Sequence, residues 1–257
     1  MNDTAITLSD IDLAAFRRDG FLVARSLADR TTCVKMREVA RDHLAQNLAP
    51  VEYEVDVRYP GSPTHADAEG GQTVRRLLHA YARNAVYRDW ATSEPVAARL
   101  RQLFACESVV LSQCHHNCMM TKQPGYSSAT LWHQDNRYWS FDHQNLISVW
   151  LALGDETRAN GCLRVLPGSH LLDIESGRFD AALFLRTDLP ANKELVATAK
   201  TVELAAGDVL FFHSRLFHAA GRNLTDETKF SLVFTYHEAD NKPIEGTRSS
   251  RFPGINL

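Results

Sequence analysis

The sequence contains no apolar run that approaches the roughly 20 residues a membrane-spanning helix needs. Its start, Met1-Asn2-Asp3-Thr4, also lacks the basic residues and apolar stretch of a signal peptide. Neither sign of charge dominates, because the formal net charge is only -3 over 257 residues. These absences argue against a membrane or a nucleic acid as a partner, and they favour a cytoplasmic location.

The sequence has few cysteines. The five cysteines are an odd number without a C-x-x-C pair, which indicates reduced thiols in a cytoplasmic protein. Cys114, His115, His116 and Cys118 lie close together, but structural zinc prefers paired ligand knuckles and no second cluster follows. We therefore interpret these four residues as core or surface residues of a strand, with a place in the wall of the pocket left open for one of the two histidines.

The length and a hydrophobic content of 44% suit one domain over residues 1–257. Its first third, about residues 8–105, is expected to form a helical buttress. The spacing of apolar residues predicts a short strand at Phe21–Ala24 and helices from Ser9 to Gly20, from Asp29 to about Leu48, near Val74–Val86 and near Glu94–Phe104. Residues 51–72, rich in Pro, Gly and acidic side chains, are predicted to form a long loop.

After Glu107 short β-rich runs alternate with turns. They are Ser108–Ser112, Cys118–Lys122, Leu146–Ala152, Leu163–Leu166, Thr201–Leu204, Val209–Phe212 and Phe230–Tyr236. This pattern predicts a mainly β fold with a helical N-terminal part: a double-stranded β-helix, or cupin-like jelly-roll barrel, over about residues 107–240. Residues 171–194 are expected to be an insertion between strands.

His133 and Asp135 form an H-x-D pair. On a strand, side chains two residues apart point to the same face, so an imidazole and a carboxylate would lie together. With one more histidine they would complete a 2-His-1-carboxylate triad, which binds Fe(II) and leaves positions open for a co-substrate and O2. Downstream, His213 and His218 both qualify as the third ligand, and spacing does not choose between them.

Several stretches together resemble motifs of the phytanoyl-CoA dioxygenase family of Fe(II)/2-oxoglutarate-dependent oxygenases. They are Phe16 to Val23, His133-Gln134-Asp135, Asn160 to His170 and Gly207 to Asn223. The resemblance implies Fe(II) held by His133, Asp135 and His218, with 2-oxoglutarate as co-substrate. It also implies hydroxylation of a small molecule by O2, with release of succinate and CO2.

The resemblance also implies an anchor for the far carboxylate of 2-oxoglutarate. The matching positions are Lys229, where the family usually has Arg, and Ser231 two residues later. Lys offers a point charge where Arg offers a planar fork, so weaker binding is expected. Arg222 is an alternative anchor. Lys122 also matches a lysine that the family often places near its active site.

Four residues near the presumed ligands are candidates for contact with the substrate: Gln134, Arg137, Trp139 and Arg222. Two arginines near a metal would suit a substrate with a carboxylate or a phosphate. Two rival hypotheses remain open from the sequence: a cupin-like metal-dependent isomerase or lyase that does not use O2, and a non-catalytic barrel that binds a small molecule.

Overall fold

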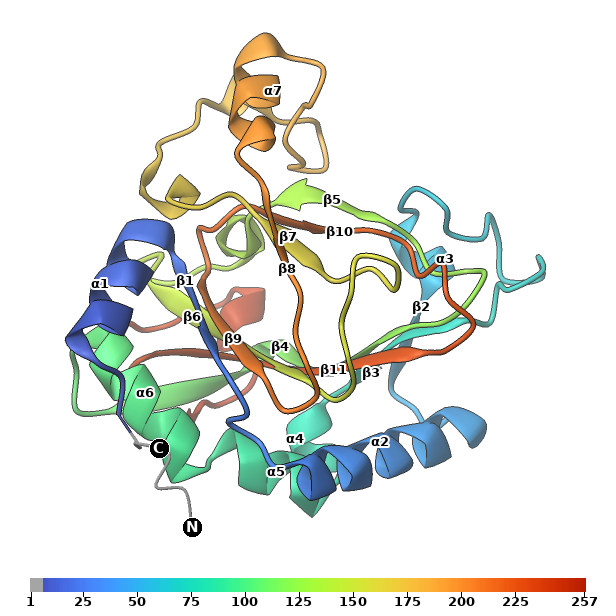
Figure 1. Cartoon of the computed structure of the whole chain (residues 1–257), viewed down its shortest axis with the longest axis horizontal. Coiled ribbons are helices and arrows are strands. Elements are labelled where there is room, and N and C mark those ends of the chain that lie inside the picture. The colour runs from blue at the N-terminus through green and yellow to red at the C-terminus, as the bar shows by residue number, and fades with distance from the viewer. Residues whose placement is uncertain (1–6) are drawn as a thin grey trace.

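The structure is a computed structural model that describes residues 7–257, and its strands form two antiparallel sheets (Figure 1). The large sheet has the order β1-β9-β6-β11-β4-β3-β2, with β12 paired to β4. Its strands are β1 (Phe21–Ala24), β2 (Val51–Tyr53), β3 (Val74–Leu78), β4 (Val109–Lys122), β6 (Leu146–Ala152), β9 (Val209–His213), β11 (Lys229–Glu238) and β12 (Ile255–Asn256). The small sheet has the order β5-β10-β7-β8, formed by β5 (Thr130–His133), β7 (Leu163–Val165), β8 (Lys200–Val202) and β10 (His218–Ala220).

From β4 onward the chain passes repeatedly from one sheet to the other. Apolar side chains of both sheets meet between them, including Trp150, Phe212 and Val233 from the large sheet and Leu163 and Val165 from the small one. Two antiparallel sheets that enclose such a core are the expected jelly roll. The predicted fold class, mainly β with helices against it, is confirmed.

Strand β11 is buried on both faces. Leu232 and Phe234 belong to a core on the helical side of the large sheet, whereas Val233 belongs to the core between the sheets. Because side chains alternate along a strand, the neighbours of Val233 at two-residue spacing, Ser231 and Lys229, also point inward. The alternation thus directs polar residues of β11 toward the space between the sheets.

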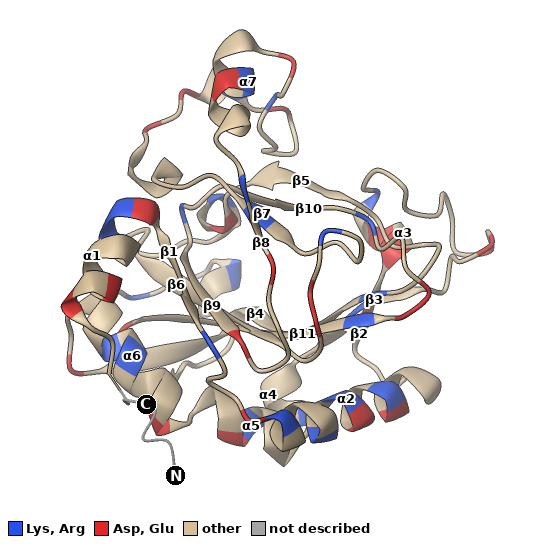
Figure 2. Cartoon of the chain, in the orientation of Figure 1, with Lys and Arg blue, Asp and Glu red and all other residues tan. Residues whose placement is uncertain are grey.

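Helices cover the outer face of the large sheet, and α2, α4 and α5 lie along it in Figure 1. The helices are α1 (Asp10–Asp19), α2 (Arg30–Ala45), α3 (Glu54–Val57), α4 (Ala80–Arg83), α5 (Ala85–Ala91), α6 (Glu94–Phe104) and α7 (Pro190–Ala197). Cys33, Met36 and Ala40 form the buried side of α2, and Figure 2 shows charges of both signs interspersed along this helix. Among residues 7–257, no helix has the length and apolarity needed to span a bilayer.

The N-terminal part differs from the prediction in one respect that affects the cavity. Residues 74–86 do not form one helix: Val74–Leu78 is strand β3, and α4 and α5 follow it. Apolar residues at 74, 77 and 78 fit a helical spacing, but pairing of β3 with β4 overrides that local preference. The predicted loop after residue 50 also begins with β2 and α3.

The two strands expected at Ser108–Ser112 and Cys118–Lys122 are one long strand, β4, interrupted by a bulge. Phe234 of β11 pairs with Asn117, and the next residue, Thr235, pairs with Ser112. Residues 113–116 are therefore extra on β4 and have no partner in β11. Bulges commonly change the direction of side chains beside active sites.

The insertion expected at residues 171–194 is confirmed between β7 and β8. It contains α7 and the 3₁₀ turn Ser176–Arg178; other 3₁₀ turns are Asp135–Tyr138, Ser169–Leu171 and Arg248–Ser250. Phe179 and Leu185 of the insertion pack with Trp132 and Phe217 in a separate core. The insertion therefore buries apolar residues that flank the strands carrying the candidate ligands.

Candidate metal centre

Two histidines face each other across the small sheet. Antiparallel pairing of β5 with β10 sets His218 opposite His133, and their ring centroids lie 4.2 Å apart. The Nδ1 atom of each ring donates to the carbonyl oxygen two residues earlier, that of Leu131 at 2.9 Å and that of Leu216 at 3.1 Å. Since a carbonyl oxygen only accepts, each Nδ1 carries the proton and each Nε2 keeps its lone pair.

Asp135 joins these two histidines from the start of a 3₁₀ turn. Strand β5 ends at His133, but Gln134 keeps an extended backbone with φ -119° and ψ 130°. The carboxylate therefore returns to the side of His133, as the alternation argument requires. Asp135 Oδ1 lies 3.6 Å from His133 Nε2 and 3.7 Å from His218 Nε2, and the three ligand atoms lie within 4.8 Å of one another.

The chemistry of these donors fits a divalent metal ion. Asp135 is buried, and its Oδ2 atom has no hydrogen-bond partner among the described residues, which is unfavourable without a cation. Burial raises the pKa of Asp135, but His116, His218 and His133 together lower it further, to well below its usual range. Burial and His133 lower the pKa of His218 to about 4, so this ring is neutral at pH 7. An ionised carboxylate and neutral imidazoles are the forms that bind metal.

The other candidate histidine, His213, ends strand β9 in a different environment. Its Nδ1 accepts a hydrogen bond from the backbone N–H of Arg215 at 3.0 Å, and its ring lies 5.4 Å from that of His170. Within residues 7–257, the group with ligand atoms close enough to share a metal contains His218 and not His213. The geometry therefore favours His218 as the third ligand, which is also the residue that the family resemblance implies.

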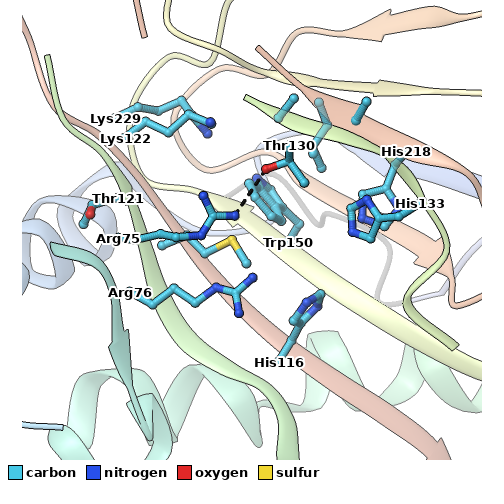
Figure 3. A pocket seen from close by; sticks show the side chains of 14 residues that line it. Arg75, Arg76, His116, Thr121, Lys122, Thr130, His133, Trp150, His218 and Lys229 are labelled. Atoms are coloured by element: carbon cyan, nitrogen blue, oxygen red, sulfur yellow. Dashed lines mark hydrogen bonds between the residues drawn. The ribbon is translucent and has the colours of Figure 1, made fainter. Parts of the chain in front are cut away.

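An inner cavity lies beside the candidate ligands, between the two sheets (Figure 3). Figure 3 shows His133 and His218 on one side of this cavity and the amino groups of Lys122 and Lys229 on the other. The residues that line it are Arg75, Arg76, His116, Met120, Thr121, Lys122, Thr130, His133, Trp150, Leu163, His218, Ala219, Ala220 and Lys229. The inner cavity thus combines an apolar wall with several cations.

The predicted co-substrate anchors lie together in the inner cavity. Lys229 is the register partner of Lys122, and its Nζ donates to Ser231 Oγ at 3.1 Å. A residue that the sequence analysis did not consider, Glu156, is also present: its Oε2 accepts from Lys229 Nζ at 3.0 Å and its Oε1 from Ser231 Oγ at 2.6 Å. Lys229 and Ser231 therefore already contact a carboxylate of the chain itself.

Lys122 has a different set of neighbours. Its Nζ donates to the backbone oxygen of Ser128 at 2.8 Å, and neither this bond nor any ion pair among the described residues gives it an anionic partner. Burial, followed by the charges of Arg75 and Lys229, lowers the pKa of Lys122 to about 7. The charge on Lys122 consequently changes near neutral pH.

The four residues predicted to contact substrate do not line the inner cavity. The Gln134 amide donates to the backbone oxygen of Arg215 and accepts from Arg137 Nε, and Arg137 lies over the ring of Phe179 at 3.6 Å. Arg222 donates to the backbone oxygens of Ser127 and Gly125 at 3.1 Å and 2.7 Å. Their role in substrate binding, like that of Trp139, stays a prediction.

Of these four residues, Trp139 contacts two histidines of β4. It stacks on His115 with 4.7 Å between ring centroids and meets His116 edge to face at 5.4 Å. His116, on the bulge, points into the inner cavity, where its Nδ1 lies 3.3 Å from Ser148 Oγ and 3.7 Å from Asp135 Oδ2. His116 is thus the one of the two adjacent histidines that lines the inner cavity, a choice that the sequence left open because the bulge has no signal in it.

Arg75 and Arg76 were missed because the segment was predicted to be helical. Arg75 donates to Ser128 Oγ at 3.0 Å and to Thr130 Oγ1 at 3.2 Å. Arg76 Nε lies 3.4 Å from Glu52 Oε1, but its two terminal nitrogens make no hydrogen bond to any described residue. Figure 3 shows this guanidinium extending across the inner cavity toward His116.

Comparison with known proteins places this geometry in a family. The family model for phytanoyl-CoA dioxygenase matches residues 16–231. The chain belongs to the phytanoyl-CoA dioxygenase family. The phytanoyl-CoA dioxygenase of Arabidopsis thaliana is 25% identical over 65% of the chain, and phytanoyl-CoA dioxygenase 1 of Oryza sativa subsp. japonica is 29% identical over 50%. These matches cover 58% and 45% of the two proteins, so the chain spans about half the length of these curated relatives.

Solved structures share the fold over nearly the whole chain. EctD from S. alaskensis with 2-oxoglutarate and 5-hydroxyectoine superposes with a TM-score of 0.75 at 19% identity, covering 95% of this chain and 80% of EctD. The epimerase SnoN in complex with Fe3+, alpha ketoglutarate and nogalamycin RO gives a TM-score of 0.73 at 24% identity, covering 91% of this chain and 85% of SnoN. At this level of identity the similarity establishes a common jelly roll.

The ligand assignment predicts that replacing His218 and replacing His213 have different effects on Fe(II) binding. His218→Ala should lower Fe(II) affinity by at least about 100-fold, because only two ligands would remain. His213→Ala should bind about one Fe(II) per chain with nearly unchanged affinity. Anaerobic equilibrium dialysis with metal analysis measures both; loss of binding in His213→Ala alone would reverse the assignment.

Proposed function

We propose that this chain is a non-haem Fe(II)- and 2-oxoglutarate-dependent oxygenase that hydroxylates a small-molecule substrate. The observation that carries the proposal is the group formed by His133, Asp135 and His218, with its free Nε2 lone pairs and unpartnered Asp135 Oδ2. Family membership supports it. When bound, iron and 2-oxoglutarate would supply oxidative decarboxylation, with succinate and CO2 released as oxygen is transferred to a C–H bond.

The residues of the chain would bind and orient these groups. His133, Asp135 and His218 would hold the metal through three adjacent ligand atoms, which leaves room for a chelating 2-oxo acid. Lys122, Lys229 and Ser231 would bind the far carboxylate. The apolar side chains of Trp150 and Leu163 in the wall of the inner cavity would exclude water from the reacting groups.

Hydroxylation is proposed as the outcome because it needs only oxygen transfer to the nearest C–H bond. Structures with this fold also include proteins described as an epimerase and a carbocyclase, both alpha ketoglutarate dependent. An isomerase or lyase that needs no O2 would not need Lys229 and Ser231 in the positions that match the family's co-substrate anchor. A non-catalytic barrel would not need His133, Asp135 and His218 to lie close enough together to bind a metal ion.

The central test uses anaerobic protein with Fe(II). Adding 2-oxoglutarate should produce a visible metal-to-ligand absorption band, and admitting O2 should yield succinate. Asp135→Ala should lose both signals. Asp173→Ala, which removes a fully exposed carboxylate, is the matched control and should keep both. A wild-type protein that gives neither band nor succinate with a broad substrate panel would refute the proposal.

The lowered pKa of Lys122 predicts how co-substrate binding depends on pH. A carboxylate binds the protonated amine, which is lost as pH rises through about 7. The dissociation constant of 2-oxoglutarate should therefore increase between pH 7 and 9, by up to about tenfold per pH unit. Lys122→Met should bind 2-oxoglutarate weakly and without this slope; an unchanged slope in Lys122→Met would assign the dependence to another group.

We further propose that the substrate carries a carboxylate or phosphate and that Arg76 binds it. Among the arginines near the metal centre, Arg76 is the one whose terminal nitrogens extend into the inner cavity without a hydrogen bond to any described residue. Arg137 and Arg222, which suggested an anionic substrate from the sequence, are engaged with Gln134 and with backbone oxygens. Two terminal N–H groups in a plane suit a bidentate oxyanion.

This substrate proposal is tested with a panel of small acids and their neutral amides or alcohols. Only acids should stimulate succinate release, and Arg76→Met should raise KM for the best acid by about 10- to 100-fold, the loss of one charge-assisted pair. Arg18→Met, which removes an exposed arginine of α1 outside the inner cavity, is the control and should change KM little. Equal stimulation by neutral analogues would contradict an anionic substrate.

A further inference from the structure

Glu156 places a carboxylate where the co-substrate's carboxylate is expected. It is fully buried. Its Oε2 accepts from Lys229 Nζ at 3.0 Å, while its Oε1 accepts from Ser231 Oγ at 2.6 Å and from Trp150 Nε1 at 2.9 Å. We call Lys229, Ser231 and Trp150 the carboxylate cradle. In this structure the cradle's donors are already directed to an anion that belongs to the protein.

The backbone fixes Glu156 in this position. Its N–H donates to Leu204 O at 2.8 Å and its carbonyl accepts from Leu204 N at 3.0 Å, which forms a bridge between two connecting segments. Five hydrogen bonds in total, two from the backbone and three to the side chain, therefore hold this residue. Moving the carboxylate out of the cradle would leave Lys229 buried without its partner, which is unfavourable.

Arg75 and Arg76 also line the inner cavity, but the charge at the far-carboxylate site is set by the two lysines and Glu156. Within the group of Lys122, Lys229 and Glu156, two ammonium groups and one carboxylate leave one net positive charge when both amines are protonated. Without Glu156 there would be two. An incoming carboxylate therefore meets a weaker attraction than two adjacent lysines would otherwise give, and it must share Lys229 with an anion in place.

On the basis of the proposed function, we propose that Glu156 is a specificity-determining residue for the co-substrate. It competes with the far carboxylate of 2-oxoglutarate for Lys229 and Ser231, and so weakens binding of this dicarboxylate relative to 2-oxo acids with an uncharged tail. The competition is electrostatic, because both anions need the same buried donors. The residue therefore sets how strongly the site prefers a dicarboxylate.

The direct test removes the charge and keeps the shape. Glu156→Gln retains an oxygen that accepts from Ser231 and Trp150 but no longer neutralises Lys229. With anaerobic Fe(II), the variant should bind 2-oxoglutarate at least about tenfold more tightly than the wild type. Affinity for 2-oxopentanoate, which lacks the far carboxylate, should change less than about twofold. Calorimetry and the visible absorption band give the dissociation constants without turnover.

A double variant protects the test against misfolding, because Glu156→Gln leaves Lys229 buried with no anion. Glu156→Gln combined with Lys229→Met removes both charges and leaves no unpaired ion. If Glu156 cancels Lys229 in the wild type, this double variant should bind 2-oxoglutarate within about threefold of the wild type. Circular dichroism and thermal unfolding confirm that each variant is folded.

The outcomes separate this inference from the proposed function. Equal or weaker binding of 2-oxoglutarate by Glu156→Gln would overturn the competition and show that Glu156 orients Lys229 instead. A loss of more than about tenfold in the double variant would also overturn it, because Lys229 would then act as an uncancelled anchor. In both cases the absorption band of the wild type would still support the oxygenase. No band in any variant would overturn both.

Discussion

Burial of strand β11 on both faces is the constraint that links the helices to the metal centre. Leu232 and Phe234 pack on the helical side, and Lys229 and Ser231 therefore face the inner cavity. A shift of one residue in the register of β11 would exchange these two sets, putting an ammonium group into the apolar core. The same apolar contacts that fix the fold thus determine which polar atoms the inner cavity presents.

Charged groups in the inner cavity are held mainly by other buried groups. Lys229 is paired with Glu156, Arg75 with Glu54, and Asp135 lies among histidine rings. Buried ion pairs seldom add net stability, because desolvation offsets their attraction. Their concentration beside one set of metal-binding atoms is better explained by function than by stability.

The sequence predicted the architecture well because its signals were local and repeated. Alternation along a strand placed Lys229 beside Ser231, and the H-x-D spacing placed His133 beside Asp135. It did not predict Arg76 and did not choose His116 over His115, since each depends on a non-local event: the pairing of β3 with β4, and four extra residues on β4 opposite β11. Glu156 was also missed, because two of its three partners in the cradle, Lys229 and Ser231, lie 73 and 75 residues away in sequence.

The hydrogen bonds of the two histidines to carbonyls two residues earlier have a consequence for assembly. Each ring takes its orientation and proton from its own segment of chain, so neither histidine depends on the other strand to become a competent ligand. Pairing of β5 with β10 then brings together two histidines that are already oriented. A cation bound by both histidines would therefore link two segments that are 85 residues apart in the chain.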